Sequence, residues 1–392
     1  MILIILFWTS VFLIFHSYVL YPLILAFLAR NKKENTLVYE ANEELPFVSI
    51  IMACHNEEMV LVEKIRSLYY TLYPLNKFEV LVGSDASTDG TNRICKVYSG
   101  NYEGFQFYPF KERKGKPSIV NQLIAKAKGD IVIITDANVL FQIKTIFELV
   151  KHFKNKKIGL VDTVMMHTGL NKSGISFQEN AYISQEVKSK QREGNIWGTM
   201  MGPFGGCYAV REEDFPSLPK NFLVDDFYVN MKILDKGLKT VNSSTAWVTE
   251  DVSNNLSDEF KRKIRIATGN FQNLKKFFFL LFQRKKGLAF SFISHKIIRW
   301  FGPFFFLTAF TSNFLLINTL PYKILFFLQL FILSLSLSDI IFKKLNLHIV
   351  FLRFITHFIG MNIALFIGFF TFLFGVNSGI WEPTRRKQSE RI

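Results

Sequence analysis

The sequence predicts an α/β domain built on a mainly parallel sheet, with membrane-spanning helices at both ends of the chain. Three observations support this fold class. Short β-branched runs alternate with helical stretches between residues 48 and 165, a pattern typical of βαβ units. Two of these runs end in an aspartate, at Asp85 and Asp136. Hydrophobic residues make up 49% of the 392 residues and concentrate at the two ends of the chain.

The first apolar segment, residues 2–29, contains no Asp, Glu, Lys or Arg and exceeds the roughly 20 residues that cross a bilayer. A cleaved signal peptide is the less favoured alternative, because the segment lacks a basic start and a small-residue cleavage site. Three basic residues follow directly, Arg30, Lys32 and Lys33, and place the next domain in the cytoplasm by the positive-inside rule. We therefore expect a transmembrane helix over residues 1–30 and a cytoplasmic domain over residues 46–285.

The cytoplasmic domain should begin with alternating strands and helices. Strands are expected near residues 48–54, 78–83, 105–110, 131–135 and 158–164. A helix over 56–73 stops before Pro74, and a helix over 116–129 carries Pro117 in its first turn and Gly129 at its end.

Beyond residue 165 the pattern is looser. The expected elements are a helix over 176–193, a glycine-rich turn and strand over 202–211, a helix that opens at 225, a strand over 238–248 and a basic helix over 258–278. The segment AFSFISHKIIRW, residues 289–300, mixes apolar, basic and tryptophan side chains, which suits a helix lying in the membrane interface. We expect this interfacial helix over residues 286–299.

The region 300–376 should be membrane-embedded, followed by a polar tail over 377–392. Its apolar stretches lie at about 300–318, 323–342 and 350–375. Three crossings from the cytoplasm would leave the basic tail outside, against the positive-inside rule. The sequence therefore leaves open which stretch is interfacial or re-entrant.

The formal charge of +15 raises the question of a nucleic-acid partner. The basic residues concentrate beside the apolar segments, where anionic headgroups would attract them, and no nucleic-acid motif accompanies them. Membrane lipids are thus the expected partners, and nucleic acid is not. Cys54, Cys95 and Cys207 form no CxxC pair, which fits a reducing compartment.

The aspartate at the end of the second expected strand lies in the segment GSDASTDGT, residues 83–91. The small residues around Asp85 allow a ligand to approach closely, and its carboxylate can accept hydrogen bonds from a nucleobase or ribose. A turn or helix-capping aspartate is the alternative interpretation.

The segment TDAN, residues 135–138, is a degenerate DxD motif. Strand alternation points Asp136 and Asn138 to the same side. One carboxylate and one amide oxygen can ligate Mg²⁺ or Mn²⁺ and bridge phosphates. A turn-and-cap interpretation stands beside this one.

A third acidic site, Asp225 and Asp226, precedes an apolar-periodic helix, whose positive end favours negative charge. A carboxylate kept ionised there can act as a general base. Helix capping would explain one of the two residues but does not require both.

Together these segments resemble, in order along nearly the whole chain, the membrane-bound family-2 glycosyltransferases related to cellulose, chitin and hyaluronan synthases. The matching segments are SIIMACHNEE (49–58), GSDASTDGT (83–91), RKGKPSIVNQ (113–122), TDAN (135–138), GPFGGCYAVR (202–211), VDDF (224–227), RKIRIATGN (262–270) and GIWEPTRR (379–386).

The resemblance implies a GT-A fold and a role for each segment. Asp226, paired with Asp225, would deprotonate the acceptor hydroxyl, and Asp136 with Asn138 would hold Mg²⁺ or Mn²⁺ at the donor diphosphate. Asp85 would contact the base of a nucleotide sugar, for which a UDP-sugar is expected. The further substrate-binding residues implied are Glu57, Lys114, Lys116, Gly205, Gly206, Arg262 and Arg265. For Arg262 and Arg265 a solvated basic helix face is an equal alternative.

Two departures from the family pattern matter. Asn138 replaces the second acid of DxD, which removes a charge from the metal site. The QxxRW motif of processive synthases is replaced by residues 262–266, RKIRI, without Gln or Trp. Processive polymerisation is therefore not supported by this segment.

The expected function is inverting transfer of a sugar from a nucleotide-sugar donor to a lipid-linked or glycan acceptor, in cell-surface polysaccharide biosynthesis at a bacterial inner membrane. A processive polysaccharide synthase that also translocates its product is the first alternative. A non-catalytic membrane scaffold that binds a nucleotide is the second, and retention of the VDDF acids opposes it, because binding alone requires no base.

Overall fold

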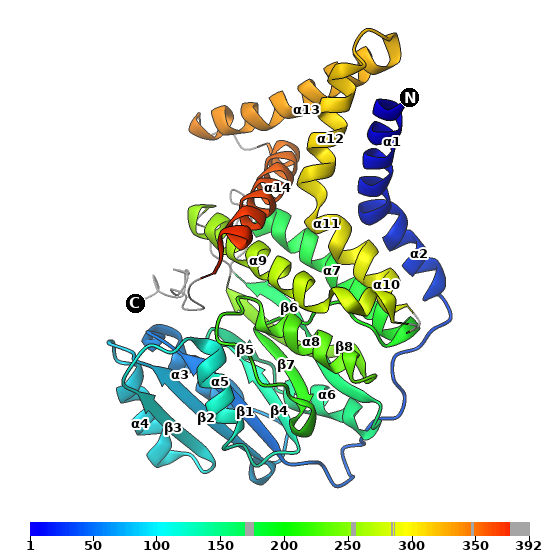
Figure 1. Ribbon diagram of the computed structural model, residues 1–392. Coiled ribbons are helices and arrows are strands. Elements are labelled where there is room, and N and C mark those ends of the chain that lie inside the picture. Colours follow the sequence, from blue (N-terminus) through cyan, green and yellow to red (C-terminus); the bar gives the residue numbers. More distant parts are fainter. Residues whose placement is uncertain (169–175, 252–255, 284, 286, 346–348, 377–392) are drawn as a thin grey trace.

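The computed structural model describes residues 1–168, 176–251, 256–283, 285, 287–345 and 349–376 (Figure 1). In this part of the chain, eight strands form one sheet in the order β3-β2-β1-β4-β7-β6-β8-β5. The strands are β1 (Val48–Cys54), β2 (Phe78–Asp85), β3 (Phe105–Phe110), β4 (Ile131–Thr135), β5 (Val139–Phe141), β6 (Ile158–Thr168), β7 (Cys207–Arg211) and β8 (Lys239–Asp251).

The sheet is mixed and mostly parallel, as the sequence predicted. Strands β3, β2, β1 and β4 run parallel to one another, and β8 runs parallel to β6. Strand β7 is antiparallel to both β4 and β6, and the short β5 is antiparallel to β8. The surrounding helices are α3 (Glu58–Tyr69), α4 (Thr91–Asn101), α5 (Lys116–Ile124), α6 (Thr145–Val150), α7 (Ser176–Trp197), α8 (Asp225–Asp235) and α9 (Leu256–Phe277).

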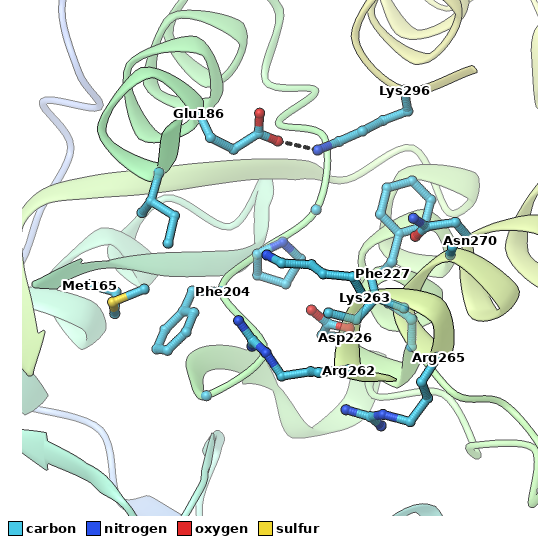
Figure 2. A pocket seen from close by; sticks show the side chains of 18 of the residues that line it. Met165, Glu186, Phe204, Asp226, Phe227, Arg262, Lys263, Arg265, Asn270 and Lys296 are labelled. Atoms are coloured by element: carbon cyan, nitrogen blue, oxygen red, sulfur yellow. Dashed lines mark hydrogen bonds and ion pairs between the residues drawn. The ribbon is translucent and has the colours of Figure 1, made fainter. Parts of the chain in front are cut away.

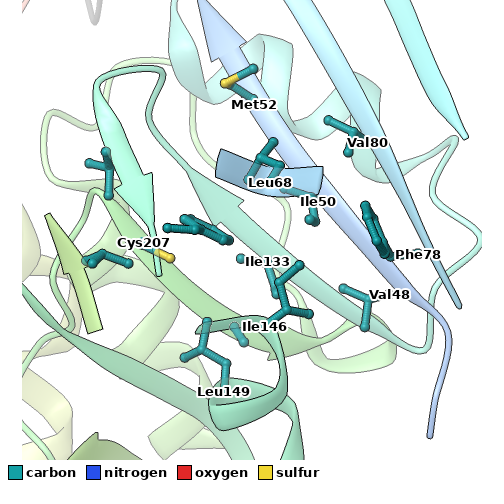
Figure 3. Packing of buried hydrophobic residues seen from close by; sticks show 14 of the residues in the cluster. Val48, Ile50, Met52, Leu68, Phe78, Val80, Ile133, Ile146, Leu149 and Cys207 are labelled. Carbon is teal, nitrogen blue, oxygen red and sulfur yellow. The ribbon is translucent and has the colours of Figure 1, made fainter. Parts of the chain in front are cut away.

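Both faces of the sheet are buried, because successive side chains of each strand enter different cores. In β1, Ile50 packs with one hydrophobic cluster and Ile51 with the other. In β2, Val80 packs in the first of these clusters and Leu81 in the second. The first cluster, drawn in Figure 3, joins the sheet to α3 and α6. Each fully buried Val, Leu or Ile stabilises the fold by about 1.5–3 kcal/mol.

The carboxyl ends of β1, β2 and β4 lie on one edge of the sheet because these strands are parallel. Strand β7 runs the other way, so the loop that enters it returns to this same edge. This glycine-rich loop, residues 202–206, is joined there to the end of β4 by a 3.0 Å hydrogen bond from the backbone N of Asp136 to the carbonyl of Gly206.

The apolar ends of the chain form helices above the sheet. The N-terminal segment is continuous through α1 (Ile2–Phe15), the π-helical turn η1 (His16–Leu20) and α2 (Tyr21–Leu28). The C-terminal elements are α10 (Leu288–Ser291), η6 (Phe292–Ile297), α11 (Ile298–Trp300), α12 (Gly302–Leu315), α13 (Leu320–Lys344) and α14 (Val350–Phe374). Figure 1 shows α7, α9, α10 and α11 between the sheet and the outer helices α1, α12, α13 and α14.

Within the described residues, three helical segments are long and apolar enough to cross a membrane: Ile2–Leu28, Leu320–Asp339 and Val350–Phe374. Helix α12 has 14 residues, which is shorter than the roughly 20 needed for a span. The apolar stretch expected at 300–318 is therefore not a spanning helix by length. The expected polar tail and the GIWEPTRR motif lie outside the described residues.

Helix α14 packs directly on α9. The contact is close because a β-carbon added at Gly368 would lie 2.4 Å from Cβ of Ala267. A candidate membrane helix thus lies over the sheet edge where Asp136, Asp225 and Asp226 gather.

Candidate active site

A cavity of about 720 Å³ lies at the carboxyl edge of the sheet. Its walls come from the end of β4, the glycine-rich loop, the start of α8, and α9, with α14 above. Among the residues expected from the sequence, the lining includes Lys116, Asp136, Asn138, Gly205, Gly206, Asp225, Asp226, Arg262 and Arg265. The cavity therefore brings together segments that are more than 140 residues apart in the chain.

Asp226 lies in the first turn of α8 and faces the glycine-rich loop. Withdrawal from bulk water and the neighbouring charge of Asp225 raise the pKa of Asp226 to about 7. The backbone N–H of Phe227 and the amines of Lys116 and Lys190 oppose this rise. A carboxylate whose pKa lies near neutrality is suited to accept a proton from a hydroxyl group.

Asp225, beside it, has a buried Oδ2 atom without a hydrogen-bond partner among the described residues. The hydroxyl of the fully buried Tyr208 likewise lacks a partner there. Burial, followed by the charges of Asp225, Asp226 and Asp136, raises the pKa of Tyr208 well above its usual value. Since buried polar atoms in folded proteins are nearly always paired, these two atoms indicate that the acidic edge is built to receive a ligand.

Lys116, at the start of α5, supplies positive charge to this acidic edge. Its Nζ lies 2.7 Å from Oδ1 of Asp136. Burial opposes the charge of the amine, but the carboxylates of Asp136, Asp225 and Asp226 raise the pKa of Lys116 above its ordinary value. A lysine held charged in this position can bind a phosphate.

Asn138 is oriented by a residue that the sequence did not single out. Its Nδ2 donates a 2.9 Å hydrogen bond to Oε1 of Glu250, at the end of β8. Glu250 also lines the cavity. Strand pairing places Glu250 opposite Val139, so the contact follows from the register of β5 and β8.

The oxygen donors suit a divalent metal that is shared with a phosphate ligand. Searched over its described residues, the structure has no group of three or more His, Cys, Asp or Glu side chains that could enclose a metal ion. Asp136 and Asn138 together offer one carboxylate and one amide oxygen to the cavity. Mg²⁺ is typically held by one or two protein oxygens, with substrate phosphates and water completing the shell.

Two arginines of α9 complete the polar wall of the cavity (Figure 2). Glu259 holds Arg262 through two hydrogen bonds, Nε to Oε2 at 2.9 Å and Nη2 to Oε1 at 3.0 Å. Burial, and then the charge of Arg262, lower the pKa of Arg265. Arg262 and Arg265 both line the cavity, where a guanidinium group can bind an anionic ligand.

Asp85, Glu57 and Lys114 do not belong to the lining of this cavity. The carboxylate of Asp85 instead accepts hydrogen bonds from the backbone N–H groups of Lys114, at 2.7 Å, and Gly115, at 3.0 Å. Asp85 therefore fixes the loop that leads to Lys116. The backbone N of Glu57 donates a 2.9 Å hydrogen bond to Oγ1 of Thr91.

A buried lysine supports the end of β4 from behind. Lys64 is fully buried, and its Nζ donates to Oγ1 of Thr135 at 2.8 Å and to the carbonyl of Val139. Its ammonium also lies 4.1 Å from the ring centre of Phe141. Burial lowers the pKa of Lys64 to about 7, against the attraction of Cys207 and Asp136. The amine of Lys64 thus joins Thr135, the first residue of the TDAN segment, to Val139, which directly follows it.

The glycine-rich loop is anchored by the fully buried Asp162 of β6. Its Oδ1 accepts the backbone N–H of Phe204 at 2.7 Å, and its Oδ2 lies 2.6 Å from Nζ of Lys190 on α7. Asn242 adds a 3.0 Å hydrogen bond to Oδ2. These contacts hold Phe204 at the cavity, as Figure 2 shows.

Several polar lining residues were not expected from the sequence: Glu186, Lys190, Glu250, His295, Lys296 and Arg299. In Figure 2, the ion pair between Glu186 and Lys296 lies above Asp226. The sequence did contain one indication of these residues. His295 and Arg299 are four residues apart in an apolar segment, so on a helix they share a face.

Comparison with known proteins agrees with this geometry. Residues 49–217 match the family model "Glycosyl transferase family 2". The match ends before the segments that carry Asp226 and Arg262, so the placement of those residues rests on the structure.

Two curated bacterial proteins are similar to most of the chain. "Probable glycosyltransferase YdaM" of Bacillus subtilis is 24% identical over 350 residues, which is 81% of this chain and 81% of that protein. "Poly-beta-1,6-N-acetyl-D-glucosamine synthase" of Staphylococcus epidermidis is 24% identical over 261 residues, which is 64% of this chain and 61% of the synthase.

Among solved structures, the chain resembles a mannosyltransferase of Pyrobaculum calidifontis in complex with GDP-Man and Mn²⁺. The TM-score is 0.69 at 22% sequence identity, and the likeness covers 94% of this chain and 99% of that one. This likeness confirms the expected fold.

Proposed function

Because the chain is a family-2 glycosyltransferase with a GT-A fold, we propose that it transfers a sugar from a nucleotide-sugar donor to the hydroxyl of a lipid-linked acceptor, with inversion at the anomeric carbon. The observation that carries this proposal is the cavity, which joins Asp226 and the basic diphosphate wall to residues of a candidate membrane helix. Those residues of α14 are Phe354, His357, Phe358, Met361 and Leu365.

Asp226 acts as the general base in this proposal. Its carboxylate takes the proton of the acceptor hydroxyl while the oxygen bonds to the anomeric carbon, and the bond from that carbon to the diphosphate oxygen breaks on the opposite face. General-base assistance of this kind contributes about 10²- to 10⁴-fold in rate. The pKa of Asp226, about 7, supports this role at neutral pH.

The donor diphosphate is proposed to lie between Lys116, Arg262 and Arg265. Asp136 and Asn138 would hold Mg²⁺ or Mn²⁺ beside it, and the bound metal would neutralise charge on the leaving diphosphate. Gly205 and Gly206 line the cavity that we propose receives the acceptor, and the absence of a side chain at Gly205 lets the loop lie close to Asp226. The expected contact of Asp85 with the base of a UDP-sugar stays a prediction, as does substrate binding by Glu57 and Lys114.

A lipid-linked acceptor is favoured over a soluble glycan because most of the α14 residues that line the cavity are apolar: Phe354, Phe358, Met361 and Leu365. Tyr18 and Phe358 form an edge-to-face aromatic pair, with ring centres 5.4 Å apart. We place residues 46–285 on the cytoplasmic side of a bacterial inner membrane and the product in polysaccharide or glycolipid biosynthesis at the cell surface.

The test uses the purified full chain in lipid nanodiscs containing bacterial lipid extract, with a panel of labelled UDP- and GDP-sugars. We expect one donor to give nucleoside diphosphate release and a single-sugar product that partitions with lipid. Water-soluble polymer of many sugars would support the processive alternative instead. Donor binding without release or transfer would support the scaffold alternative.

A further inference from the structure

A buried ionic cluster lies between α7 and the helical segment 292–300. Glu186 of α7 accepts from Nε2 of His295 and from Nη1 of Arg299, each at 2.9 Å, and from Nζ of Lys296. Burial of this carboxylate opposes its charge, but the three cationic groups hold the pKa of Glu186 well below its usual range. Glu186 is therefore ionised, and Figure 2 shows its ion pair with Lys296.

A second carboxylate lies two helical turns further along α7, at Glu193, which is fully buried. Its Oε1 accepts the hydroxyl of Tyr21 at 2.6 Å and Nδ1 of His295 at 2.6 Å. Its Oε2 accepts the backbone N–H of Met201 at 2.9 Å. Glu193 thus binds three separate parts of the chain: the N-terminal membrane helix, the segment 292–297 and the entrance of the glycine-rich loop.

The glycine-rich loop is held at three points along its length. Glu193 holds its entrance through Met201, Asp162 holds Phe204 in its middle, and Asp136 holds its last residue through the backbone. Asp162 lies within β6 of the sheet, and Asp136 directly follows β4. Glu193 instead has its other partners in helices that lie above the sheet (Figure 1).

The same loop faces the proposed base at very short range. A β-carbon built on Gly205 would stand 2.8 Å from Oδ2 of Asp226. Small displacements of the loop therefore change the space that Asp226 and the acceptor hydroxyl share. A misplacement on the order of 1 Å can cost about 10²-fold in rate.

We infer that Glu193 is a positioning residue, which sets the glycine-rich loop against Asp226 and makes that setting depend on the N-terminal helix through Tyr21. This inference rests on the proposed function, because it takes Asp226 as the reacting base. It assigns the N-terminal helix a part in catalysis beyond anchoring the protein in the membrane.

A purely structural role for Glu193 is the competing explanation. Buried ionic groups are costly to desolvate and are often no better for stability than apolar packing, so their retention commonly reflects a need for one defined arrangement. Only the positioning role predicts that loss of a Glu193 contact changes the glycine-rich loop specifically. An experiment that measures the loop can therefore separate the two explanations.

The first measurement is hydrogen–deuterium exchange of the full chain in nanodiscs without substrate. Glu193→Gln and Tyr21→Phe should each raise exchange in the peptide that covers residues 200–207, by about tenfold for Glu193→Gln, because a hydrogen bond to a charged group is lost. The α5 peptide, residues 116–124, should be unchanged. The matched control is Glu213→Gln, an exposed acid-to-amide change in the same domain.

This readout needs no turnover, so its failure is distinct from failure of the proposed function. Where a donor has been found, Glu193→Gln should lower kcat about 10- to 100-fold and leave the KM for the donor within twofold. Unchanged exchange at 200–207 in both variants would overturn the inference. If Glu193→Gln destabilises the whole domain, Tyr21→Phe decides, since it removes one hydroxyl and keeps the carboxylate.

Discussion

Gly205 and Asp226, which both line the cavity, lie so close together that no side chain fits between them. A β-carbon at Gly205 would lie 2.8 Å from Oδ2 of Asp226. The acid comes from the first turn of α8 and the glycine from the loop before β7. Their contact joins the proposed base to the glycine-rich loop and shows why this loop position has no side chain.

Gly205→Ala is expected to lower the rate of transfer by about tenfold or more, because the added methyl group displaces the carboxylate of Asp226. Binding of the nucleoside diphosphate, measured by calorimetry, should change less than the rate, since the side chains of Lys116 and Asp136 are retained and only the carbonyl of Gly205 contacts Lys116. Gly100→Ala in α4 is the matched control, because a β-carbon there meets nothing within 4 Å. Normal turnover of Gly205→Ala would contradict the proposed geometry.

The pH dependence of transfer should report Asp226. Because the pKa of this carboxyl is about 7, its basic form becomes scarcer below neutrality, and kcat should fall about tenfold per pH unit there and level off above about pH 7.5. Asp226→Asn should abolish transfer and retain nucleotide binding. Transfer that survives in this variant would mean that another group is the base.

The same group gives a stability prediction with a defined sign. The pKa of Asp226 rises from 3.8 to about 7 on folding, so the folded state binds more protons between these values and stability falls as pH rises through this window. Asp226→Asn should therefore have the higher Tm above pH 7, although it is inactive. Thermal unfolding in nanodiscs at pH 5 and pH 8 measures the difference.

Chelation should stop turnover, because the proposed leaving group carries two phosphates and the protein offers few oxygen donors of its own. Addition of Mg²⁺ or Mn²⁺ should restore transfer, and the comparison shows which ion is preferred. Full activity in excess chelator would remove the metal from the mechanism.

Asn138→Asp would complete the DxD pattern, yet we expect it to impair the site. The amide of Asn138 donates to Glu250 at 2.9 Å, and a carboxylate in its place would repel that acid. Mn²⁺ affinity measured with nucleoside diphosphate should therefore fall in the single variant and recover in Asn138→Asp combined with Glu250→Gln. A gain of affinity in the single variant would show that Glu250 does not set the identity of residue 138.

Much of the fold could be predicted because the strands are buried on both faces and read as short β-branched runs. Strands 48–54, 105–110 and 131–135 have the predicted bounds. The three-residue β5 and the six-residue α6 were not predicted, since elements this short leave no periodicity to detect.

The acidic segments were predicted as site residues, and the cavity brings Asp136, Asn138, Asp225 and Asp226 together. Local sequence patterns could not predict contacts between residues that are far apart in the chain. The carboxylate of Asp85 binds the backbone of Lys114 and Gly115, 29 and 30 residues away. Glu193 meets His295 across 102 residues, and both look like ordinary helix residues in the sequence.

The complete burial of Tyr21 has a practical consequence for work on this protein. Its hydroxyl is one of the donors to a carboxylate that has no access to solvent. A shortened chain that begins after residue 30 would leave Glu193 without the hydroxyl of Tyr21. We expect water to reach the carboxylate of Glu193 in such a chain. Versions of the chain for crystallisation should therefore keep residues 16–28 and change exposed apolar side chains such as Leu23 and Phe27 instead of deleting the helix.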